Sequence, residues 1–229
     1  MSGVKAPLRP VAPAMRAEAG ELRDFLAAHP GIEAFDLLLV DSNGILRGKT
    51  VRRHEMEGIY ENGRNLPGSI LGLDVAGEDV NETGLVWSDG DADRCAWPVP
   101  STLAPAPWTD PPKGQFRVVL HEIDGAPVAA DPRHVLRRQI EALAARGFQA
   151  LVAFELEFYP VETAGDGAAQ PLPAILPLTG ERSGGTHVYS IEELDRLEPF
   201  TRDLYRAAAA QGLPVETLIS EYAPGQFEL

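Results

Sequence analysis

Residues 151–159 constrain the fold of this chain most strongly, because two acids alternate there with large apolar residues. Glu155 and Glu157 flank Leu156 within the sequence FELEF. Alternation with a period of two predicts a strand with two different faces. Two carboxylates on one face of a strand stand about 6–7 Å apart, and their charges repel each other unless a cation neutralises them. The pattern therefore predicts a strand that binds a metal ion or pairs with a basic group.

Composition indicates a globular protein and limits its partners. The hydrophobic content of 44% is ordinary for such a protein, and no apolar run approaches the length of a membrane span. A net charge of −14 argues against nucleic acid, which binds basic surfaces, although solubility alone would also explain the charge. The single cysteine, Cys95, excludes an internal disulfide and favours a reducing, cytoplasmic location.

The first half of the chain is predicted to be rich in strands. Residues 1–19 contain many proline and alanine residues and are predicted to form a disordered arm. The turn sequence DSNG at 41–44 predicts a hairpin. The predicted elements are a helix over 15–28, strands over 35–40, 45–51, 69–75 and 85–88, a proline-rich linker over 102–112 and a hairpin over 116–129.

The second half mixes helices and strands. Asp131 and Pro132 are typical of a helix start, and Gly147 is predicted to end that helix. The predicted buried stripe of this helix is Val135, Leu136, Ile140 and Leu143. The elements expected after it are a strand over 151–159, a surface loop over 165–185, helices between Ser190 and Gly212 that Pro199 divides, and strands over 214–221 and 227–229. Because Leu229 falls inside a predicted strand, we expect the chain to be the front part of a longer protein.

Three other motifs fail the requirements of the sites that they resemble. Segment 44–50 (GILRGKT) has three residues between its glycines, where a phosphate-binding loop needs four, and it is predicted to continue as a strand. The acidic segment 89–93 lacks the glycine and the final glutamate of a calcium loop. His187 has no second histidine at ligand spacing.

Further acids near the end of the chain can join the first pair. Glu221 and Glu228 bracket a predicted turn at 223–226, so they are expected on adjacent strands, and Glu216 precedes Glu221 on the same strand. Carboxylate ligands favour Mg²⁺ or Mn²⁺ over zinc. The alternative is that these glutamates are surface acids on strands with one polar face.

Two of these segments, taken in order, resemble the glutamine synthetase family. FELEF at 154–158 and EYAPGQFE at 221–228 are similar to an E-x-E strand and an E…G-Q-x-E hairpin that bind two divalent metals in that family. DSNGILRGK at 41–49 resembles a hairpin of the family's N-terminal domain. The resemblance runs from about residue 20 to the end. It implies an α+β fold, with a β-grasp domain over 20–125 and the first part of the catalytic α+β domain over 126–229.

The resemblance also implies roles for the five glutamates. Glu155 would bind the metal near the nucleotide's γ-phosphate, and Glu216 matches a position at the nucleotide site. Glu157, Glu221 and Glu228 would bind the metal near glutamate. The family uses ATP to phosphorylate the γ-carboxylate of glutamate, and an amine then displaces phosphate. It uses two Mg²⁺ or Mn²⁺ ions per site and assembles as a ring, a dodecamer by resemblance.

Because the family's remaining ligands and substrate-binding arginines would lie beyond Leu229, no catalytic residue is assigned in this chain. The 229-residue chain is expected to be inactive by itself.

One departure from the family bears on the acceptor. Glutamine synthetases carry an Asp-Gly-Ser-Ser loop whose acid binds ammonium, whereas the matching stretch here is 66–70 (LPGSI), with Pro67 in place of the acid. Segments 71–74 and 81–85 also look like the γ-glutamylpolyamine synthetase branch. The acceptor is therefore expected to be an organic amine, and the resemblance to this branch implies a polyamine. Alternatives are a true glutamine synthetase, a non-catalytic β-grasp module and a two-metal hydrolase.

Overall fold

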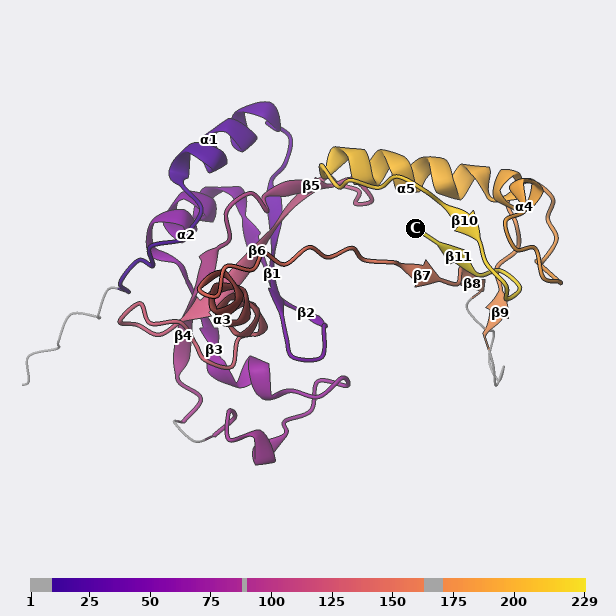
Figure 1. Cartoon of the computed structure of the whole chain (residues 1–229). Helices are drawn as coiled ribbons and strands as arrows, with labels where there is room; N and C mark the ends of the chain where they lie inside the picture. The colour runs from indigo at the N-terminus through magenta and orange to yellow at the C-terminus, as the bar shows by residue number, and fades with distance from the viewer. Residues whose placement is uncertain (1–9, 88–89, 163–170) are drawn as a thin grey trace, which may run out of the picture. The chain divides into compact units, whose positions relative to one another are not determined.

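The computed structural model describes residues 10–87, 90–162 and 171–229, which form two compact units, Met1–Ala150 and Leu151–Leu229 (Figure 1). Each unit has its own hydrophobic core. The predicted α+β class is confirmed, because both units combine helices and strands. The predicted domain boundary at 125/126 stays a prediction, and the helix that follows it, α3 (Pro132–Ala144), lies in the first unit.

A six-stranded sheet forms the centre of the first unit. Its order is β2-β1-β6-β4-β3, with β5 paired to β6. Strand β1 runs parallel to β6, and all other neighbours are antiparallel. The strands are β1 (Ala34–Val40), β2 (Leu46–Arg52), β3 (Arg64–Pro67), β4 (Asp93–Pro98), β5 (Ala104–Ala106) and β6 (Lys113–His121).

The core of this unit lies between the sheet and two short helices. Every second residue of β1 is buried, so Phe35, Leu37 and Leu39 all belong to the core. Helices α1 (Ala19–Ala28) and α2 (Met56–Asn62) contact each other and contribute further apolar side chains (Figure 1). Burial of each large side chain contributes about 1.5–3 kcal/mol, so the alternation of β1 is a main source of this unit's stability.

The turn between β1 and β2 forms as predicted. The buried Asp41 accepts hydrogen bonds from the backbone N–H groups of Asn43 and Ile45, each at 2.9 Å, and pairs with Arg47 at 2.9 Å. Burial raises the pKa of Asp41, but the hydrogen bond from Arg47 and those from the backbone outweigh burial and lower the pKa overall. Gly48 is required in β2, since a Cβ atom there would lie 1.7 Å from the Leu37 carbonyl oxygen.

Segment 44–50 therefore continues into strand β2, as predicted, rather than into the helix that follows a phosphate-binding loop. The predicted hairpin over 116–129 is also confirmed, since Glu122 N–H donates to Ala126 O at 2.8 Å and Val128 N–H to Leu120 O at 3.1 Å. Both features depend on contacts between residues that are close in sequence. Local turn chemistry is sufficient to specify them.

Three predicted elements of the first unit are wrong. Residues 69–75 do not form a strand: Gly68–Gly72 is a 3₁₀ helix, because this short apolar run buries Leu71 within a turn. Residues 85–87 are not a strand either, and Ser88 lies outside the described residues. The proline-rich segment 102–112 is not a linker, since it contains β5, which pairs with β6 on one side and so tolerates prolines.

The beginning of the chain differs from the expectation in its bounds. The first helix begins at Ala19 rather than at residue 15. Residues 1–9 of the predicted arm lie outside the described residues, while Val11 N–H donates to Ile123 O and the buried Ala17 donates to Pro98 O, each at 2.9 Å. The described part of the arm is thus bonded to the first unit.

The second unit is built from short elements around a small core. Its three-stranded sheet has the order β10-β11-β7, and a second pair joins β8 to β9. Ser190 caps the first helix, as predicted, by accepting the Glu193 N–H at 3.2 Å. The elements are β7 (Glu157–Phe158), β8 (Val161–Glu162), β9 (Leu172–Pro173), α4 (Ile191–Arg196), α5 (Glu198–Ala210), β10 (Ile219–Ser220) and β11 (Phe227–Glu228).

The strand predicted over 151–159 is too long. Only Glu157 and Phe158 form β7, although Leu156 also exchanges two backbone hydrogen bonds with Leu229, at 3.1 and 3.0 Å. Leu151 and Phe154 are 97% and 85% exposed. The strand predicted over 214–221 is likewise reduced to β10. Of the three apolar residues predicted to share a face, Phe158 packs against Phe200 and Phe227, whereas Phe154 and Leu156 stay exposed.

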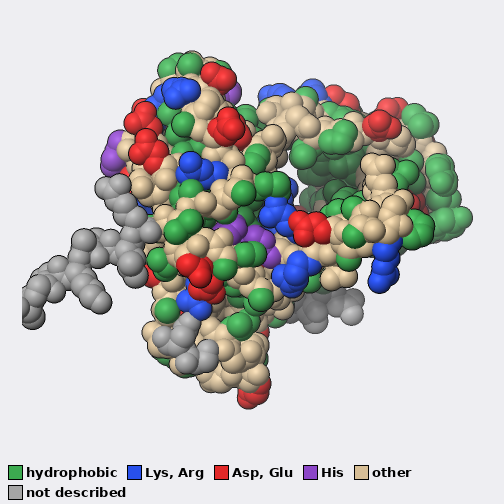
Figure 2. Space-filling view, turned by 60° about the vertical axis from the view of Figure 1, so that its left-hand side comes forward, with side chains coloured by type: hydrophobic (Ala, Val, Ile, Leu, Met, Phe, Trp, Pro, Cys, Tyr) green, Lys and Arg blue, Asp and Glu red, His purple; other side chains and the backbone are tan. Residues whose placement is uncertain are grey.

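The apolar stripe predicted for α3 is not buried. Asp131 caps the helix as expected, with its side chain accepting the Arg133 N–H at 2.9 Å. The buried residue of α3 is instead His134. The stripe residues that are exposed are Val135, Leu136, Ile140 and Leu143. Helical spacing predicted correctly that these four residues share one face of α3. The helix packs on the sheet through its first turn instead, so this face stays exposed. Figure 2 shows apolar side chains exposed among acidic and basic ones on the face in view.

Candidate metal centre

The sheet β10-β11-β7 brings together the glutamates that the sequence singled out. Glu228 on β11 lies opposite Glu157 on β7, in an antiparallel pair. Glu221 directly follows β10, and its N–H donates to the Gln226 carbonyl at 2.9 Å across the hairpin turn. Glu155 precedes Glu157 by two residues. Of the four predicted metal ligands, Glu157 and Glu228 thus lie on neighbouring strands of one small sheet, and Glu155 and Glu221 lie within two residues of its strands.

The negative charges of these carboxylates act on one another. The pKa of Glu228 is raised, first by desolvation and then by a hydrogen bond with Glu221. The negative charges of Glu155, Glu221 and Glu157 raise it further. Like charges close together disfavour the ionised form of each carboxyl group. A cation placed among these acids would relieve that repulsion.

Gln226 fixes one of the carboxylates. Its Nε2 donates to Glu157 Oε2 at 2.6 Å, and its Oε1 accepts the Ala223 N–H at 3.2 Å. The backbone N–H of Gln226 also donates to Ala223 O at 3.0 Å, which closes the predicted turn. Because the Ala223 N–H can only donate, the amide of Gln226 has a defined orientation and directs its NH₂ group toward Glu157.

Glu216 lies in the extended segment before β10. It lines a cavity of about 680 Å³ together with Glu155 and Glu228. Apolar residues of 152–156 and 213–219 form most of the remaining wall. Glu157 and Glu221 do not line this cavity, so three of the five predicted site residues share one cavity and the other two lie beside it on the same sheet.

The donor chemistry of this cluster fits a hard divalent cation. Four carboxylates on adjacent strands supply oxygen ligands of the kind that Mg²⁺ and Mn²⁺ prefer. As they stand, no three Asp, Glu, His or Cys side chains in the described parts of the chain converge with the geometry of a metal site. The raised pKa of Glu228 nevertheless shows the repulsion that such an ion would remove. The oxygen ligands therefore fit such an ion in chemical type, while their present positions do not form a complete site.

Sequence reasoning assigned no role to Gln226, although it quoted this residue within the motif EYAPGQFE. Its contact with Glu157 joins residues 69 positions apart. The sequence did offer one signal for such a role: the Gln226 side chain, two residues before Glu228, carries both a hydrogen-bond donor and an acceptor. The turn determines where that side chain lies, and only the structure shows which carboxylate it contacts.

Comparison with known proteins identifies the class of this α+β chain. Residues 129–229 match the family model described as "Glutamine synthetase, catalytic domain". The sequence is 33% identical over 209 residues to gamma-glutamylputrescine synthetase PuuA of Escherichia coli K12. These findings, with the carboxylate hairpin, show that the chain belongs to the glutamine synthetase family.

Other relatives refine the likeness. Glutamate–isopropylamine ligase of a Pseudomonas species is 28% identical over 212 residues, and gamma-glutamylethanolamide synthetase GlnA4 of Streptomyces coelicolor is 31% identical over 210 residues. The alignments with these two relatives and with PuuA cover 89–91% of this chain but 44–45% of the relatives. The chain thus spans less than half of their length and corresponds to their N-terminal portion.

Solved structures agree on the fold. A structure entitled "Crystal structure of novel glutamine synthase homolog" superposes with a TM-score of 0.69 at 23% identity, over 86% of this chain and 42% of that one. A structure entitled "GmaS/ADP complex-Conformation 1" gives a TM-score of 0.62 at 23% identity, over 89% of this chain and 42% of the other. At this identity the likeness is one of fold.

Proposed function

We propose that this chain contributes to an ATP-dependent ligase that joins the γ-carboxyl group of glutamate to an organic amine. The observation that carries the proposal is the cluster of Glu155, Glu157, Glu221 and Glu228 around one short sheet. The relatives are more than twice as long as the matched region, so turnover is proposed for a protein that includes the counterpart of their remaining length. The chain by itself is expected to be inactive.

Two Mg²⁺ or Mn²⁺ ions are proposed to bind at this cluster in the complete site. Glu155 would hold the ion on the nucleotide side, and Glu157, Glu221 and Glu228 would hold the ion on the glutamate side. When bound, such ions neutralise charge between ATP and the carboxylate that receives its phosphoryl group. Glu216, which lines the cavity beside Glu155, is proposed to contact the nucleotide.

The residues of this chain would prepare that site in two ways. Gln226 holds one oxygen of Glu157, so the other oxygen keeps a constant direction toward a bound cation. The hairpin turn holds Glu221 and Glu228 on adjacent strands, so both carboxylates can approach one ion. The amine then displaces phosphate from the activated glutamate, as the family resemblance implies.

An organic amine is the proposed acceptor, with a polyamine as the finer expectation. The three relatives described above carry names that refer to putrescine, isopropylamine and ethanolamide. Pro67, at the end of β3, can neither attract nor deprotonate ammonium. Ammonium is the second candidate, because relatives of 29–30% identity are named glutamine synthetase, among them those of Mycolicibacterium smegmatis and Mycobacterium tuberculosis.

Further features of the complete protein follow from family resemblance and belong to the same proposal. They are a β-grasp domain in the first unit, assembly into a homo-oligomeric ring and a cytoplasmic location. Within the described residues, no helix is long and apolar enough to cross a membrane.

The first test is the binding of Mn²⁺ to the 229-residue chain, followed by electron paramagnetic resonance. We expect weak, saturable binding that Glu228→Gln reduces at least tenfold, because the charges of the other three acids all act on this residue. Glu181→Gln is the matched control, since it removes the same charge from an exposed position in the same unit. If both variants lost Mn²⁺ affinity equally, or if the wild type bound no Mn²⁺, the proposed metal site would be wrong.

The second test concerns the acceptor. A protein extended to the full length of the relatives should release phosphate from ATP in the presence of glutamate and putrescine or ethanolamine. Ammonium at the same concentration should be a poorer acceptor. A preference for ammonium would favour the second candidate, while metal-dependent hydrolysis without ATP would favour a hydrolase.

A further inference from the structure

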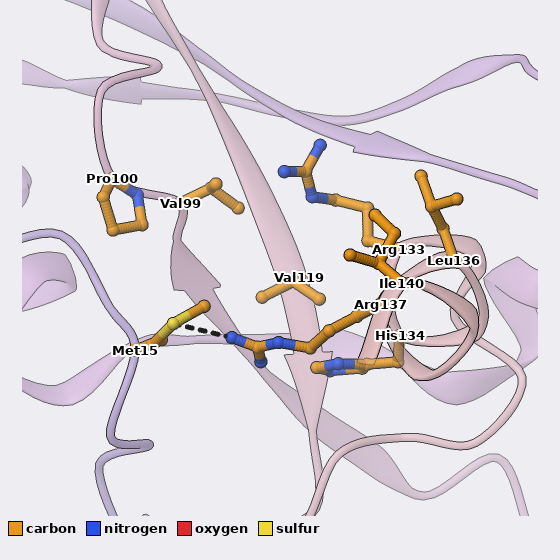
Figure 3. Close-up of a pocket in the computed structure, with 9 residues that line it drawn as sticks. All are labelled: Met15, Val99, Pro100, Val119, Arg133, His134, Leu136, Arg137 and Ile140. Atoms are coloured by element: carbon orange, nitrogen blue, oxygen red, sulfur yellow. Dashed lines mark hydrogen bonds between the residues drawn. The ribbon is translucent and has the colours of Figure 1, made fainter. Parts of the chain in front are cut away.

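A second cavity belongs to the first unit, whereas the glutamate cluster belongs to the second. Its volume is about 260 Å³, and it lies between α3, strand β6, the segment after β4 and the chain before α1 (Figure 3). Every residue that lines it belongs to Met1–Ala150. The cavity takes no part in the function proposed above.

Most of the wall is apolar. Val119 of β6 lies at the centre of the view, with Val99 and Met15 on one side and Leu136 and Ile140 of α3 on the other (Figure 3). Leu136 and Ile140 belong to the apolar stripe of α3 that the unit leaves exposed. The cavity therefore offers a place where a small apolar group can leave water, which contributes about 25 cal/mol per Å² buried.

Two guanidinium groups extend from α3 over this apolar wall. Arg137 contacts the Met15 sulfur at 2.9 Å through one Nη and approaches Glu141 at 3.5 Å through Nε. Arg133 forms no hydrogen bond or salt bridge through its side chain with any of the described residues. In a chain with a net charge of −14, a partnerless arginine beside a second arginine is an unusual local excess of positive charge.

The surroundings of Arg133 leave that charge uncompensated. Its pKa is lowered by burial and by the charges of Arg117 and Arg137. Asp131 acts in the opposite direction, but its two oxygens already accept the backbone N–H groups of Arg133 and Leu120, each at 2.9 Å. Arginine stays protonated under these conditions. An anion at the cavity would therefore gain from the charges of Arg133 and Arg137, which Asp131 and Glu141 offset in part.

We propose that this cavity binds a small carboxylate that carries an apolar body. The planar guanidinium of Arg133 can bind a carboxylate through two parallel hydrogen bonds, and the wall formed by Val99, Val119 and Ile140 receives the apolar part. The volume lies slightly below the usual range of ligand pockets, which limits the ligand to a small molecule.

The test uses the 229-residue chain and hexanoate as the probe, with binding followed by ¹H–¹⁵N nuclear magnetic resonance. Hexanoate should produce saturable shifts at the amides of Val99, Val119 and Ile140. Acetate supplies the same charge without the apolar chain, and 1-hexanol supplies the chain without the charge. Both should bind at least tenfold more weakly than hexanoate. Equal affinity for hexanoate and either control would overturn the proposal.

Two arginine variants separate a specific contact from general attraction. Arg133→Gln should weaken hexanoate binding about tenfold, because it removes a charge-assisted hydrogen bond. Arg138→Gln is the matched control: it removes the same charge from α3, but from a side chain that donates to Ala129 O and does not line the cavity. The control should change affinity less than twofold. Equal losses in both variants, or shifts confined to the second unit, would contradict the proposed site.

Discussion

Two apolar runs of this molecule have opposite surroundings. In β1, Phe35, Leu37 and Leu39 are at most 1% exposed and pack under α1 and α2. In the run before and through β7, Phe154 is 85% and Leu156 is 58% exposed. Both runs contain several large apolar residues, so their presence alone does not explain the difference. A strand is stabilised by the layer that covers it: the first unit's core covers every inward-facing residue of β1, whereas the second unit's core includes Phe158 but not Phe154 or Leu156.

The largest test of this comparison is a matched pair of phenylalanine substitutions. Phe35→Ala should cost the first unit about 3–5 kcal/mol, because it opens a cavity in the core. Phe154→Ala should change the stability of the second unit by less than about 0.5 kcal/mol, as expected for an exposed side chain. Both tryptophan fluorescence and circular dichroism should be followed during urea unfolding.

These probes distinguish the units, because Trp87, Trp97 and Trp108 all lie in the first unit. Helix α5 dominates the helical signal of the second. A loss of several kcal/mol from Phe154→Ala would mean that this side chain is covered in solution, and the comparison would fail.

Acid should affect the two units in opposite directions. Burial, and then the charge of His134, lower the pKa of His121 from 6.5 to about 4. The unfolded chain therefore binds a proton that the folded unit excludes, and the first unit loses stability as pH falls from about 6.5 to about 4. A difference of 2.5 pKa units at 1.36 kcal/mol each gives a loss of about 3 kcal/mol.

Glu228 should change the stability of the second unit with pH in the opposite direction. Because its folded-state pKa is raised, its contribution to the second unit is favourable at low pH and is lost as pH rises through that pKa. Urea unfolding at a series of pH values measures both effects. In His121→Leu the fluorescence-monitored slope between pH 6.5 and pH 4 should decrease, whereas the exposed His54→Leu should keep it. An unchanged slope in His121→Leu would assign the pH dependence to other groups.

The smallest expected effect concerns Gln226, and it should appear in binding rather than in stability. Gln226→Leu removes the donor that holds Glu157, so Mn²⁺ binding to the chain should weaken about tenfold. Gln139→Leu, on exposed α3, is the control and should leave binding unchanged. If Gln226→Leu binds Mn²⁺ as well as the wild type while Glu228→Gln does not, the metal site stands and the positioning role of Gln226 is wrong.

The sequence predicted best what depends on neighbouring residues. The Asp131 cap, the turn at 41–44 and the hairpin turn at 223–226 all formed, because each is specified by side chains and backbone within a few positions. The grouping of Glu221 with Glu228 followed from that last turn. These features need no knowledge of the rest of the fold.

Features that depend on distant contacts could not be predicted in this way. The stripe of α3 was assigned to a core that does not cover it, and the strand over 151–159 was predicted longer than β7. Arg137 and Met15 lie 122 positions apart, and no local pattern links them. The period of apolar residues shows which side chains share a face of a helix or strand. Whether that face is buried depends on which other element packs against it, and the period does not show this.

The parallel pairing of β1 with β6 also sets an order of events during synthesis. Strand β2 ends at Arg52 and β6 begins at Lys113, 61 residues later, yet β6 is the central partner of β1. At about 5–20 residues per second, the β1–β2 hairpin waits about 3–12 s on the ribosome before its partner strand exists. During that interval one edge of β1 remains unpaired, so the nascent chain carries an open strand edge to which another chain can bind.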